Sequence, residues 1–332
     1  MTKKRGITIG HVGLGKWGLT LFDNFSALAG CRVKYACDLR QELLSKLQGE
    51  FDTKFIDDVN EMLADEEVEA VVVATEAPSH YKIALSALKH NKHVYIEKPI
   101  TLDIAQAEEL VELAKKNNKK IMVGHLLLYH PAIKKLKELI TAGELGKINY
   151  VGTQRLNLGR IRETENVVWS LAPHDISIVL YLIGKQPTGV FVHGADFIQK
   201  NIADMAFLNL RFNSGEIAHI QVSWLNPEKQ RRTVVVGSKK MAVFDEILNG
   251  GTLQLFDKGA ALTPNGVELK SGQGGVVALS SQKPLEIECQ HFIDCVRDNC
   301  EPLSNGGNGL AVLSVLMAAE KSLFKQGCYE LL

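Results

Sequence analysis

The sequence predicts an α/β protein with two domains, a doubly wound parallel sheet followed by a domain built on a large, mostly antiparallel sheet. Three observations lead to this fold class. A glycine-rich turn joins the first expected strand and helix, strands and helices alternate through the first third, and later strand-like segments follow one another without helices. At 332 residues the chain is too long for one ordinary core, so we place a domain boundary after residue 125.

The first element is a strand over residues 7–12, which leads through a glycine-rich turn into a helix over residues 16–28. In this order the pattern Gly-x-Gly-x-x-Gly indicates a dinucleotide-binding site, although a lone glycine triplet can also be an ordinary turn. Gly13 would allow the tight turn, Gly15 the approach of a pyrophosphate, and Gly18 the close packing of helix and strand. The residues expected to bind the cofactor here are Gly13, Leu14, Gly15, Lys16, Trp17 and Gly18.

The second strand, over residues 32–37, ends at Asp38, which lies 20 residues beyond Gly18. An acid at this point can accept both adenosine-ribose hydroxyls and would repel a 2′-phosphate, so it favours NAD over NADP. Arg40 follows two residues later and could weaken that preference. We therefore interpret residues 1–125 as a Rossmann dinucleotide-binding domain whose cofactor is NAD, with NADP as the less favoured alternative.

The rest of this domain alternates between the two element types. We expect helices over residues 41–47, 59–64, 78–90 and 103–117, and strands over residues 70–75, 93–96 and 120–124. The segment 70–75 is apolar nearly throughout, as in a strand covered on both faces. Asp103 is a suitable N-cap for the helix that follows it.

Beyond residue 125 the pattern changes. Helices are expected over residues 132–141 and 170–183, with a long strand over 147–156 between them. From Thr188 to Phe256, strand-like segments are separated by turn signals, which indicates one antiparallel or mixed sheet. Residues 260–281 are rich in glycine and serine and are predicted to be a long loop. Helices over residues 285–297 and 310–324 close the chain.

The composition argues against some classes of function. Lysine plus arginine equals aspartate plus glutamate, 38 each, so no net charge draws the protein to nucleic acid or an acidic membrane. No apolar stretch approaches the roughly 20 residues needed to span a bilayer. The basic start lacks a signal-peptide core, and we expect a cytoplasmic protein.

The six cysteines include no Cys-x-x-Cys pair. Cys289, His291, Cys295 and Cys300 could suggest a metal site. At about 100° per residue on one helix, however, Cys289 and Cys300 share a face while the other two point elsewhere. We therefore predict no metal, and reduced, mostly buried thiols.

Chemistry is expected where parallel strands end, because ligands of open α/β sheets collect there. The segments 75–78 and 97–99 and His125 follow such strand ends. Lys98 lies between an apolar strand and a proline, where a cation could polarise a substrate hydroxyl or assist its deprotonation. The alternative is a surface lysine in a turn.

His174 is the second candidate for proton transfer. It lies in an apolar helix start shortly after Trp169, and a neutral imidazole could take a hydroxyl proton while a hydride leaves the same carbon. The alternative is a core histidine that is hydrogen-bonded to the backbone.

Upstream of Trp169 lies a basic cluster of Arg155, Arg160 and Arg162. Arginine side chains match phosphate oxygens, so the cluster could hold the diphosphate of a nucleotide sugar. Ion pairs with Glu163 and Glu165 on a solvated edge explain it equally well.

Together these motifs resemble the glucose–fructose oxidoreductase, inositol dehydrogenase and MocA (Gfo/Idh/MocA) family over essentially the whole chain. The residues that carry the resemblance are the glycine pattern, Asp38, Thr75, Pro78, His80, Glu97-Lys98-Pro99 and His174. The resemblance implies NAD(P)-dependent oxidation or reduction at a sugar or cyclitol carbon, with Lys98 catalytic and His174 as proton acceptor. It also implies that residues 126–332 form a substrate-binding domain through whose sheet the protein pairs as a homodimer or homotetramer.

By the same resemblance, further residues are expected to contact ligands. For the cofactor these are Arg40, Thr75, Pro78, His80, Glu97 and Lys98. For the substrate they are Lys98, Tyr129, Arg160, Arg162, Trp169, His174 and Asp175.

One position departs from the family. Members often carry an aspartate four residues before this histidine, whereas here Ser170 occupies that position. The orientation or basicity of His174 would then depend on another group, and neighbouring Asp175 is the candidate.

Three stretches, residues 128–132, 168–177 and 223–227, are most similar to nucleotide-sugar 3-dehydrogenases. This similarity implies oxidation of the 3-hydroxyl of a UDP-N-acetylhexosamine to a 3-keto sugar. Two alternatives stay open: a dehydrogenase of a free sugar or inositol, and a non-catalytic sensor that binds NAD and a sugar.

Overall fold

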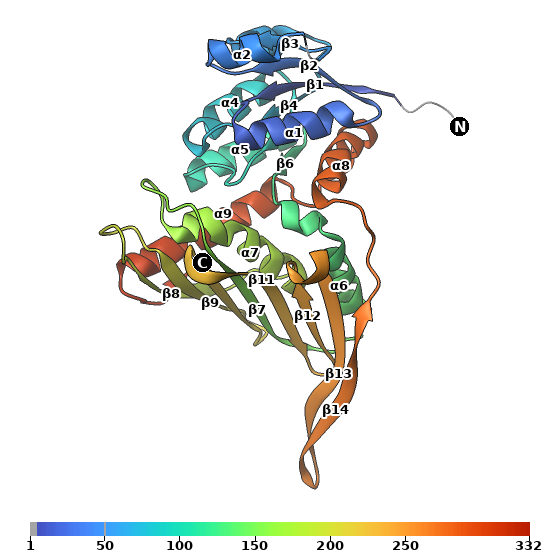
Figure 1. Ribbon diagram of the computed structural model, residues 1–332, viewed down its shortest axis with the longest axis vertical. Helices are drawn as coiled ribbons and strands as arrows, with labels where there is room; N and C mark the ends of the chain where they lie inside the picture. The colour runs from blue at the N-terminus through green and yellow to red at the C-terminus, as the bar shows by residue number, and fades with distance from the viewer. Residues whose placement is uncertain (1–4, 50) are drawn as a thin grey trace. The chain divides into compact units, whose positions relative to one another are not determined.

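The computed structural model describes residues 5–49 and 51–332, which divide into two compact units with one sheet each (Figure 1). The first unit extends to Leu126 and also includes Gln282–Leu313. The second consists of Leu127–Ser281 and Ser314–Leu332. Within the described ranges, no helix combines the length and apolar character that a membrane span requires.

The sheet of the first unit has six parallel strands in the order β3-β2-β1-β4-β5-β6, which confirms the predicted doubly wound topology. The strands are β1 (Ile7–Val12), β2 (Cys31–Cys37), β3 (Lys54–Ile56), β4 (Ala70–Val73), β5 (His93–Ile96) and β6 (Ile121–Val123). All four residues of β4 are buried, as expected for a central strand. The short edge strand β3 was not expected from the sequence.

The helices that connect these strands also follow the prediction closely. They are α1 (Lys16–Ala27), α2 (Gln41–Leu47), α3 (Val59–Ala64), α4 (Ala77–Lys89) and α5 (Ile104–Lys116). The side chain of Asp103 accepts a hydrogen bond from the backbone N–H of Gln106, which confirms it as the N-cap of α5.

The C-terminal part of the chain returns to the first unit. Helix α8 (Pro284–Asp298) packs on α1 and β1, and its Phe292 contacts Phe25 with 6.2 Å between ring centroids. Ser304 then exchanges two hydrogen bonds with the backbone of Val123, each 2.7 Å long. This return differs from the expectation that the second domain continues to residue 332. Its cause is the apolar face of α8, which covers α1.

The second unit contains a nine-stranded sheet in the order β14-β13-β12-β11-β7-β10-β9-β8-β15. Only β7 and β10 pair in parallel, which confirms a mostly antiparallel sheet. The strands are β7 (Ile148–Leu158), β8 (Gly189–Ala195), β9 (Met205–Arg211), β10 (Ile217–Ser223), β11 (Leu225–Gly237), β12 (Met241–Asp245), β13 (Thr252–Thr263), β14 (Gly266–Val277) and β15 (Glu330–Leu331).

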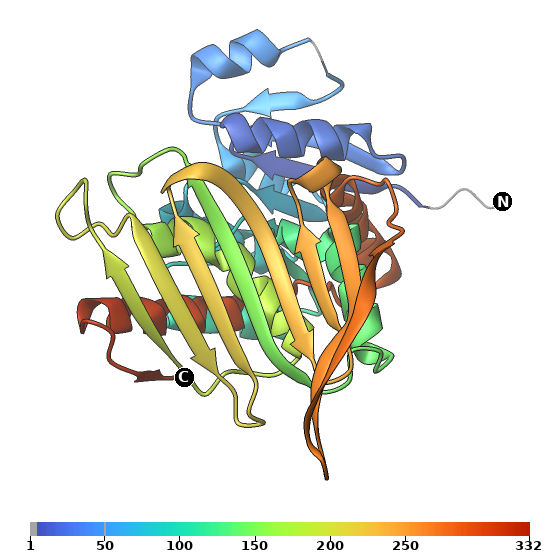
Figure 2. The same ribbon diagram turned by 60° about the horizontal axis from the view of Figure 1, so that its bottom comes forward.

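Helices cover one face of this sheet, and Figure 2 shows the strands in front of them. Helix α7 (Val167–Ile183) packs on β7, β9 and β10, and α6 (Pro131–Thr141) packs on α7 and β12. Gly184 ends α7 in the left-handed conformation, with φ of 74°. The remaining helical elements are η1 (Leu126–Tyr129), η2 (Leu248–Gly250) and α9 (Gly306–Phe324).

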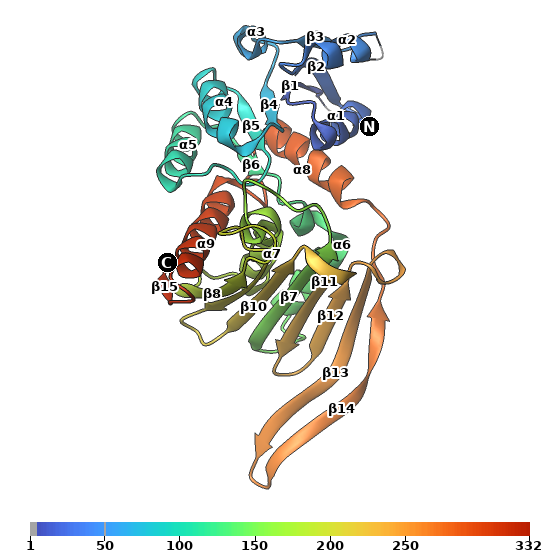
Figure 3. The ribbon, with the colours of Figure 1, turned by 60° about the vertical axis from the view of Figure 1, so that its left-hand side comes forward.

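The prediction of a long loop over residues 260–281 is wrong. Strand β13 continues to Thr263 and is joined to β14 by a tight turn at Pro264 and Asn265, after which Gly266 has φ of 113°. The two strands extend together beyond the ends of their neighbours (Figure 3). From Lys258 to Val276 most of their side chains are exposed, so the alternation of apolar and polar residues that reveals a half-buried strand is missing there.

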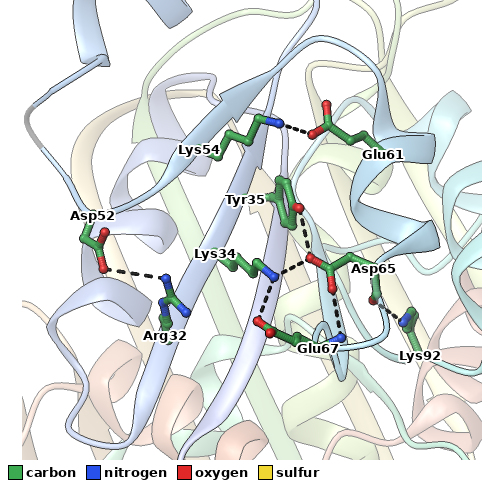
Figure 4. A network of polar contacts seen from close by, with 9 residues as sticks. All are labelled: Arg32, Lys34, Tyr35, Asp52, Lys54, Glu61, Asp65, Glu67 and Lys92. Carbon is green, nitrogen blue, oxygen red and sulfur yellow. Dashed lines mark hydrogen bonds and ion pairs between the residues drawn. The ribbon is translucent and has the colours of Figure 1, made fainter.

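Figure 4 shows a polar network that ties β2 to the segment before β4. The Lys34 ammonium lies 2.5 Å from the Asp65 carboxylate, which also accepts a 2.9 Å hydrogen bond from the Tyr35 hydroxyl. Lys92 donates to the backbone carbonyl of Asp65 at 2.8 Å. Because Asp65 precedes β4, the network lies away from the carboxyl strand ends where ligands collect, and its role is to hold the sheet.

Candidate functional site

The glycine turn after β1 is shaped by close backbone contacts. Gly13 has φ of 95°, and a Cβ there would lie 2.6 Å from the carbonyl oxygen of Ala74. A Cβ on Gly18 would overlap the carbonyl oxygen of Gly13. Over Gly15, in contrast, no atom lies within 4 Å of the Cβ position. Two glycines are therefore required by the fold, and the third leaves open space beside the turn.

The start of α1 can bind an anion. Gly15 is the N-cap and provides no side-chain capping bond, and the first turn of the helix contains no acidic residue. Its first N–H groups and the positive end of the helix dipole can therefore be directed at a phosphate group. This arrangement fits the pyrophosphate of a dinucleotide.

Asp38 is held by its neighbours at the end of β2. Its carboxylate accepts hydrogen bonds from the backbone N–H of Leu14 at 2.8 Å and from the guanidinium of Arg40 at 2.8 and 2.7 Å. The Asp38 side chain is 9% exposed and that of Arg40 is 59% exposed. The hydrogen bond from Arg40 lowers the pKa of Asp38 to about 2. Asp38 is thus a largely buried anion that is paired with the exposed Arg40 side chain.

The turn after β5 is tied to α1. The indole N–H of Trp17 donates to Glu97 Oε1 at 2.8 Å, and the backbone N–H of Lys98 donates to Glu97 Oε2 at 3.2 Å. Burial raises the pKa of Glu97, while the Trp17 hydrogen bond and the charge of Lys98 act in the opposite direction. Glu97 therefore links Trp17 and Lys98, which were predicted separately to contact the cofactor.

His80 joins the strand ends of β4 and β5. Its Nδ1 lies 2.8 Å from the carbonyl oxygen of Pro99, and its Nε2 lies 3.0 Å from that of Thr75. Thr75 Oγ1 also accepts a 2.6 Å hydrogen bond from Ser79. Pro78 lies in the first turn of α4 and is exposed. The structure thus brings Thr75 and His80 together. His80 is buried and connects the segments that follow β4 and β5.

His125 follows β6 and is also buried. Its Nδ1 lies 2.6 Å from the side-chain oxygen of Asn308 in α9, within the first unit. Burial lowers the pKa of His125 to about 4, and the positive charge of Lys98 adds to the effect. The positive charge of Lys98 thus lowers the pKa of both Glu97 and His125, which follow β5 and β6.

In the second unit, α7 carries His174 in a partly exposed position. The next residue, Asp175, is 1% exposed and accepts a 2.5 Å hydrogen bond from Arg155 Nε of β7. Asp175, suggested as a partner of His174, is therefore bonded to Arg155. Arg155 in turn is buried, so it does not belong to an open phosphate-binding cluster.

Of the other residues predicted to contact substrate, Arg160, Arg162 and Trp169 lie in or just before the first turn of α7. Asn166 caps this helix by accepting from the backbone N–H groups of Val168 and Trp169. Arg162 pairs with Glu165 at 3.4 Å, and both side chains are 40% exposed. Arg160 is exposed in the same connection, whereas Tyr129 is buried in η1.

Sequence reasoning missed Arg231. This residue of β11 donates to the carbonyl oxygen of Leu156 at 3.1 Å and to Asn157 Oδ1 at 2.8 Å. Burial lowers its pKa, and the neighbouring charge of Arg155 lowers it further. Arg231 lies beside Arg232 in a polar strand segment that gives no local signal, because only the pairing of β11 with β7 brings Arg231 to Arg155.

The cysteine prediction is partly wrong. Cys295 Sγ lies 3.5 Å from His291 Nε2 and 3.3 Å from Cys300 Sγ, so these three side chains come together. Helix α8 ends before Cys300, and the left-handed conformation of Asn299 turns the chain back. All six cysteines are free thiols, of which only three are buried. Among the described residues, no group of three or more potential ligands is arranged to hold a metal ion.

Comparison with known proteins gives two matching family models. Residues 7–125 match the model of the GFO/IDH/MocA oxidoreductase family with an NAD-binding Rossmann fold. Residues 133–243 match the GFO/IDH/MocA C-terminal domain.

Two curated relatives match over nearly their whole length. UDP-N-acetylglucosamine 3-dehydrogenase of Acidithiobacillus ferrooxidans is 28% identical over 94% of either chain. Myo-inositol 2-dehydrogenase of Thermotoga maritima is 26% identical over 95% of this chain and 96% of its own. A solved structure of the first enzyme superimposes with a TM-score of 0.85 at 25% identity and covers 97% of this chain and 99% of its own.

Proposed function

Because the chain belongs to the Gfo/Idh/MocA family of oxidoreductases and has its NAD-binding Rossmann domain, we propose that it oxidises the 3-hydroxyl of a UDP-N-acetylhexosamine, foremost UDP-N-acetylglucosamine, to a 3-keto sugar. The observation that carries this proposal is the similarity to UDP-N-acetylglucosamine 3-dehydrogenase. It extends over 94% of both sequences and includes the fold of both units.

We further propose NAD as the cofactor. The residues of the first unit fit it: open space over Gly15, uncapped N–H groups at the start of α1, and an ionised Asp38 for the ribose. When bound, NAD supplies the acceptor for the hydride. Asp38 would repel the additional phosphate of NADP, and Arg40 is the residue able to oppose this selection.

The protein's own residues would handle the substrate proton. Lys98, whose charge already acts on Glu97 and His125, would polarise the hydroxyl oxygen of the substrate. His174 would accept the hydroxyl proton on its imidazole. Arg160 and Arg162 would bind the diphosphate, and Trp169 would contact the sugar nucleotide from the first turn of α7.

One observation favours a second candidate, a dehydrogenase of inositol. Arg162 is already paired with Glu165, so a diphosphate would have to displace a carboxylate from it. The myo-inositol 2-dehydrogenase is 26% identical, nearly as similar as the nucleotide-sugar enzyme. A neutral polyol would need no such displacement.

A substrate screen distinguishes these proposals. The purified protein is mixed with NAD and either UDP-N-acetylglucosamine, myo-inositol or glucose, and NADH formation is followed by its absorbance. Turnover that is fastest with UDP-N-acetylglucosamine supports the proposal. Turnover of myo-inositol alone transfers the assignment to the second candidate, and NAD binding without turnover of any substrate would indicate a sensor.

We also propose that the protein forms a homodimer or homotetramer through the sheet of the second unit. The face of this sheet opposite α6 and α7 carries partly exposed side chains such as Val234 and Val243. It also carries Phe207 stacked on His219 at 5.9 Å. Light scattering after size-exclusion chromatography should give a multiple of 36.6 kDa, and a monomer would contradict the proposal.

A further inference from the structure

Two thiols and an imidazole meet at the end of α8, apart from the residues proposed to bind cofactor and substrate. Cys295 is fully buried in this helix, whereas Cys300 lies two residues beyond its end and is exposed. The Cys300 thiol donates a 3.3 Å hydrogen bond to Cys295 Sγ, and Cys295 Sγ lies 3.5 Å from His291 Nε2. These three side chains, called here the thiol site, have no part in the proposed function.

The way in which α8 ends brings the two thiols together. Asn299 has the left-handed conformation, with φ of 52°, and the backbone N–H of Cys300 donates to the carbonyl oxygen of Cys295 at 3.2 Å. This is the backbone pattern of a Schellman motif, in which the side chains at these two positions usually make an apolar contact. The motif therefore explains why the side chains touch. It does not explain why both are thiols, because two aliphatic side chains would serve the helix end equally well.

The segment that contains Cys300 is fixed on both sides of α8. Glu301 pairs with Lys120 at 2.6 Å, and the backbone N–H of Leu303 donates to His291 Nε2 at 3.0 Å. The two sulfur atoms are thus held in contact by the surrounding structure. A disulfide bond of about 2.05 Å would require them to approach by roughly 1 Å, which small rotations about the side-chain bonds provide.

The hydrogen bond from Leu303 also determines the role of His291. A backbone N–H can only donate, so His291 Nε2 carries no proton and accepts. Cys295, at 3.5 Å, can direct its thiol hydrogen to the same nitrogen. Burial raises the pKa of Cys295, and the hydrogen bond with Cys300 raises it further, so this thiol becomes a nucleophile only when a base takes its proton. His291 is positioned as that base.

We propose that Cys295 and Cys300 are a modification site at which a hydroperoxide oxidises the two thiols to an intrachain disulfide. The exposed Cys300 reacts first: its sulfur attacks the peroxide, the O–O bond breaks, and Cys300 becomes a sulfenic acid while water or an alcohol leaves. The Cys295 sulfur then attacks that of Cys300 as His291 takes the thiol proton. The S–S bond forms, the S–O bond breaks, and the hydroxide receives this proton and leaves as water. The two electrons that the thiols lose reduce the peroxide.

Peptide mapping tests the disulfide. The full-length protein is reduced, freed of reductant, treated with a few equivalents of hydrogen peroxide, denatured and alkylated. Trypsin cleaves after Arg297, between the two cysteines, so the proposed disulfide joins the peptides 271–297 and 298–321. We expect this linked pair and the loss of two hydrogen atoms from the mass of the intact chain. Dithiothreitol should reverse both changes.

Cysteine variants test the two roles. Cys300→Ser should abolish the linked peptides and leave Cys295 as a free thiol, because a buried thiol does not meet the peroxide. Cys295→Ala should stop the reaction at a sulfenic acid on Cys300, which dimedone traps. Cys328→Ser removes another exposed thiol and is the matched control, in which the linked peptides should still form.

His291→Gln tests the base. Glutamine keeps an acceptor for the backbone N–H of Leu303 but cannot take the proton of Cys295. The second step should then be slower by roughly 10²-fold or more, the usual contribution of a general base. Dimedone should accordingly label Cys300 more strongly in this variant than in the wild type. Equal labelling would overturn the role of His291.

Three results would overturn the disulfide itself. They are a wild type in which every thiol is still alkylated after peroxide treatment, peptides that remain linked in Cys295→Ala through Cys289, and irreversible oxidation of Cys300 without a disulfide. None of these measurements requires dehydrogenase activity, so they decide the inference whether or not the proposed substrate is oxidised.

Discussion

At the scale of single residues, the selection of the cofactor depends on the charge of Asp38. Arg40 lowers the pKa of this carboxyl group from 3.8 to about 2. Because the folded-state pKa is depressed, the ion pair contributes stability above the ordinary pKa, and this contribution is lost as the pH falls towards 2. At any pH where the enzyme can be assayed, Asp38 is therefore ionised and repels a 2′-phosphate.

NAD should accordingly bind at least about tenfold more tightly than NADP, which corresponds to about 1.4 kcal/mol. The ratio should increase between about pH 5 and about pH 7, because the 2′-phosphate of NADP loses its second proton near pH 6 while Asp38 stays ionised throughout. Fluorescence titration with both cofactors measures it, and Asp38→Asn should reduce the ratio. Equal or tighter binding of NADP by the wild type would mean that Arg40 overrides the acid.

Lys98 is the residue on which the proposed proton chemistry depends most. Lys98→Ala should lower kcat by roughly 10²- to 10⁴-fold, the usual effect of losing a positioned proton-transfer group, while the Kd for NAD stays nearly unchanged. Lys89→Ala, at an exposed position of α4, is the matched control. Wild-type turnover in Lys98→Ala would refute the catalytic role, and lost NAD binding would reassign the lysine to the cofactor.

At the scale of elements, the ion pair of Arg155 and Asp175 fixes α7 on the sheet. Both side chains are at least nine-tenths buried, and the pair joins the helix that carries His174 to β7. A charge left alone in such a place keeps its desolvation penalty and loses its partner. The position of His174 therefore depends on this pair.

Arg155→Met or Asp175→Leu alone should lower the free energy of unfolding by about 3–5 kcal/mol, whereas the double variant should recover most of that loss. Urea denaturation followed by circular dichroism measures the difference. Single variants that lose less than about 1 kcal/mol would show that the pair is well hydrated in solution.

Most elements could be predicted because their pattern is local. The apolar run of β4, the N-cap Asp103 and the terminal Gly184 each mark an element within a few residues. The outer part of the β13–β14 hairpin could not be predicted, since most of its side chains are exposed and no alternation of side chains records its pairing. Nor does the sequence of α8 reveal that it packs against α1 of the first unit.

The candidate site, too, has features that the sequence predicts and contacts that it does not. Motifs at strand ends, such as the glycine turn and Lys98, could be located because each is continuous in the sequence. The hydrogen bond from Trp17 to Glu97 joins residues 80 positions apart, and that from His125 to Asn308 spans 183 positions. Contacts of this kind are determined by the packing of whole elements, so they leave no local signal.

At the scale of the whole molecule, the proposed function requires residues of both units. The first carries the residues that fit NAD together with Lys98, and the second carries His174 and the exposed arginines. The family is established by both units, whereas the substrate depends on side chains of the second. The exposed arginines therefore provide the test of a nucleotide sugar against a neutral polyol.

If the substrate carries a diphosphate, Arg160→Ala or Arg162→Ala should raise KM for UDP-N-acetylglucosamine by roughly ten- to a hundredfold, from the loss of a charge-assisted hydrogen bond of about 1.5–3 kcal/mol. Turnover at saturation should fall less, because the diphosphate lies away from the reacting carbon. Glu165→Gln, which frees Arg162, should lower KM. Unchanged KM in both arginine variants would make this segment a solvated edge.

The origin of the transferred hydride tests the central claim most directly. UDP-N-acetylglucosamine that carries deuterium only at C3 is incubated with the protein and NAD, and the reduced cofactor is analysed by mass spectrometry. The account predicts that the reduced cofactor contains the deuterium and that the sugar product is a ketone at C3. A reduced cofactor without deuterium, or none formed from this substrate, would contradict it.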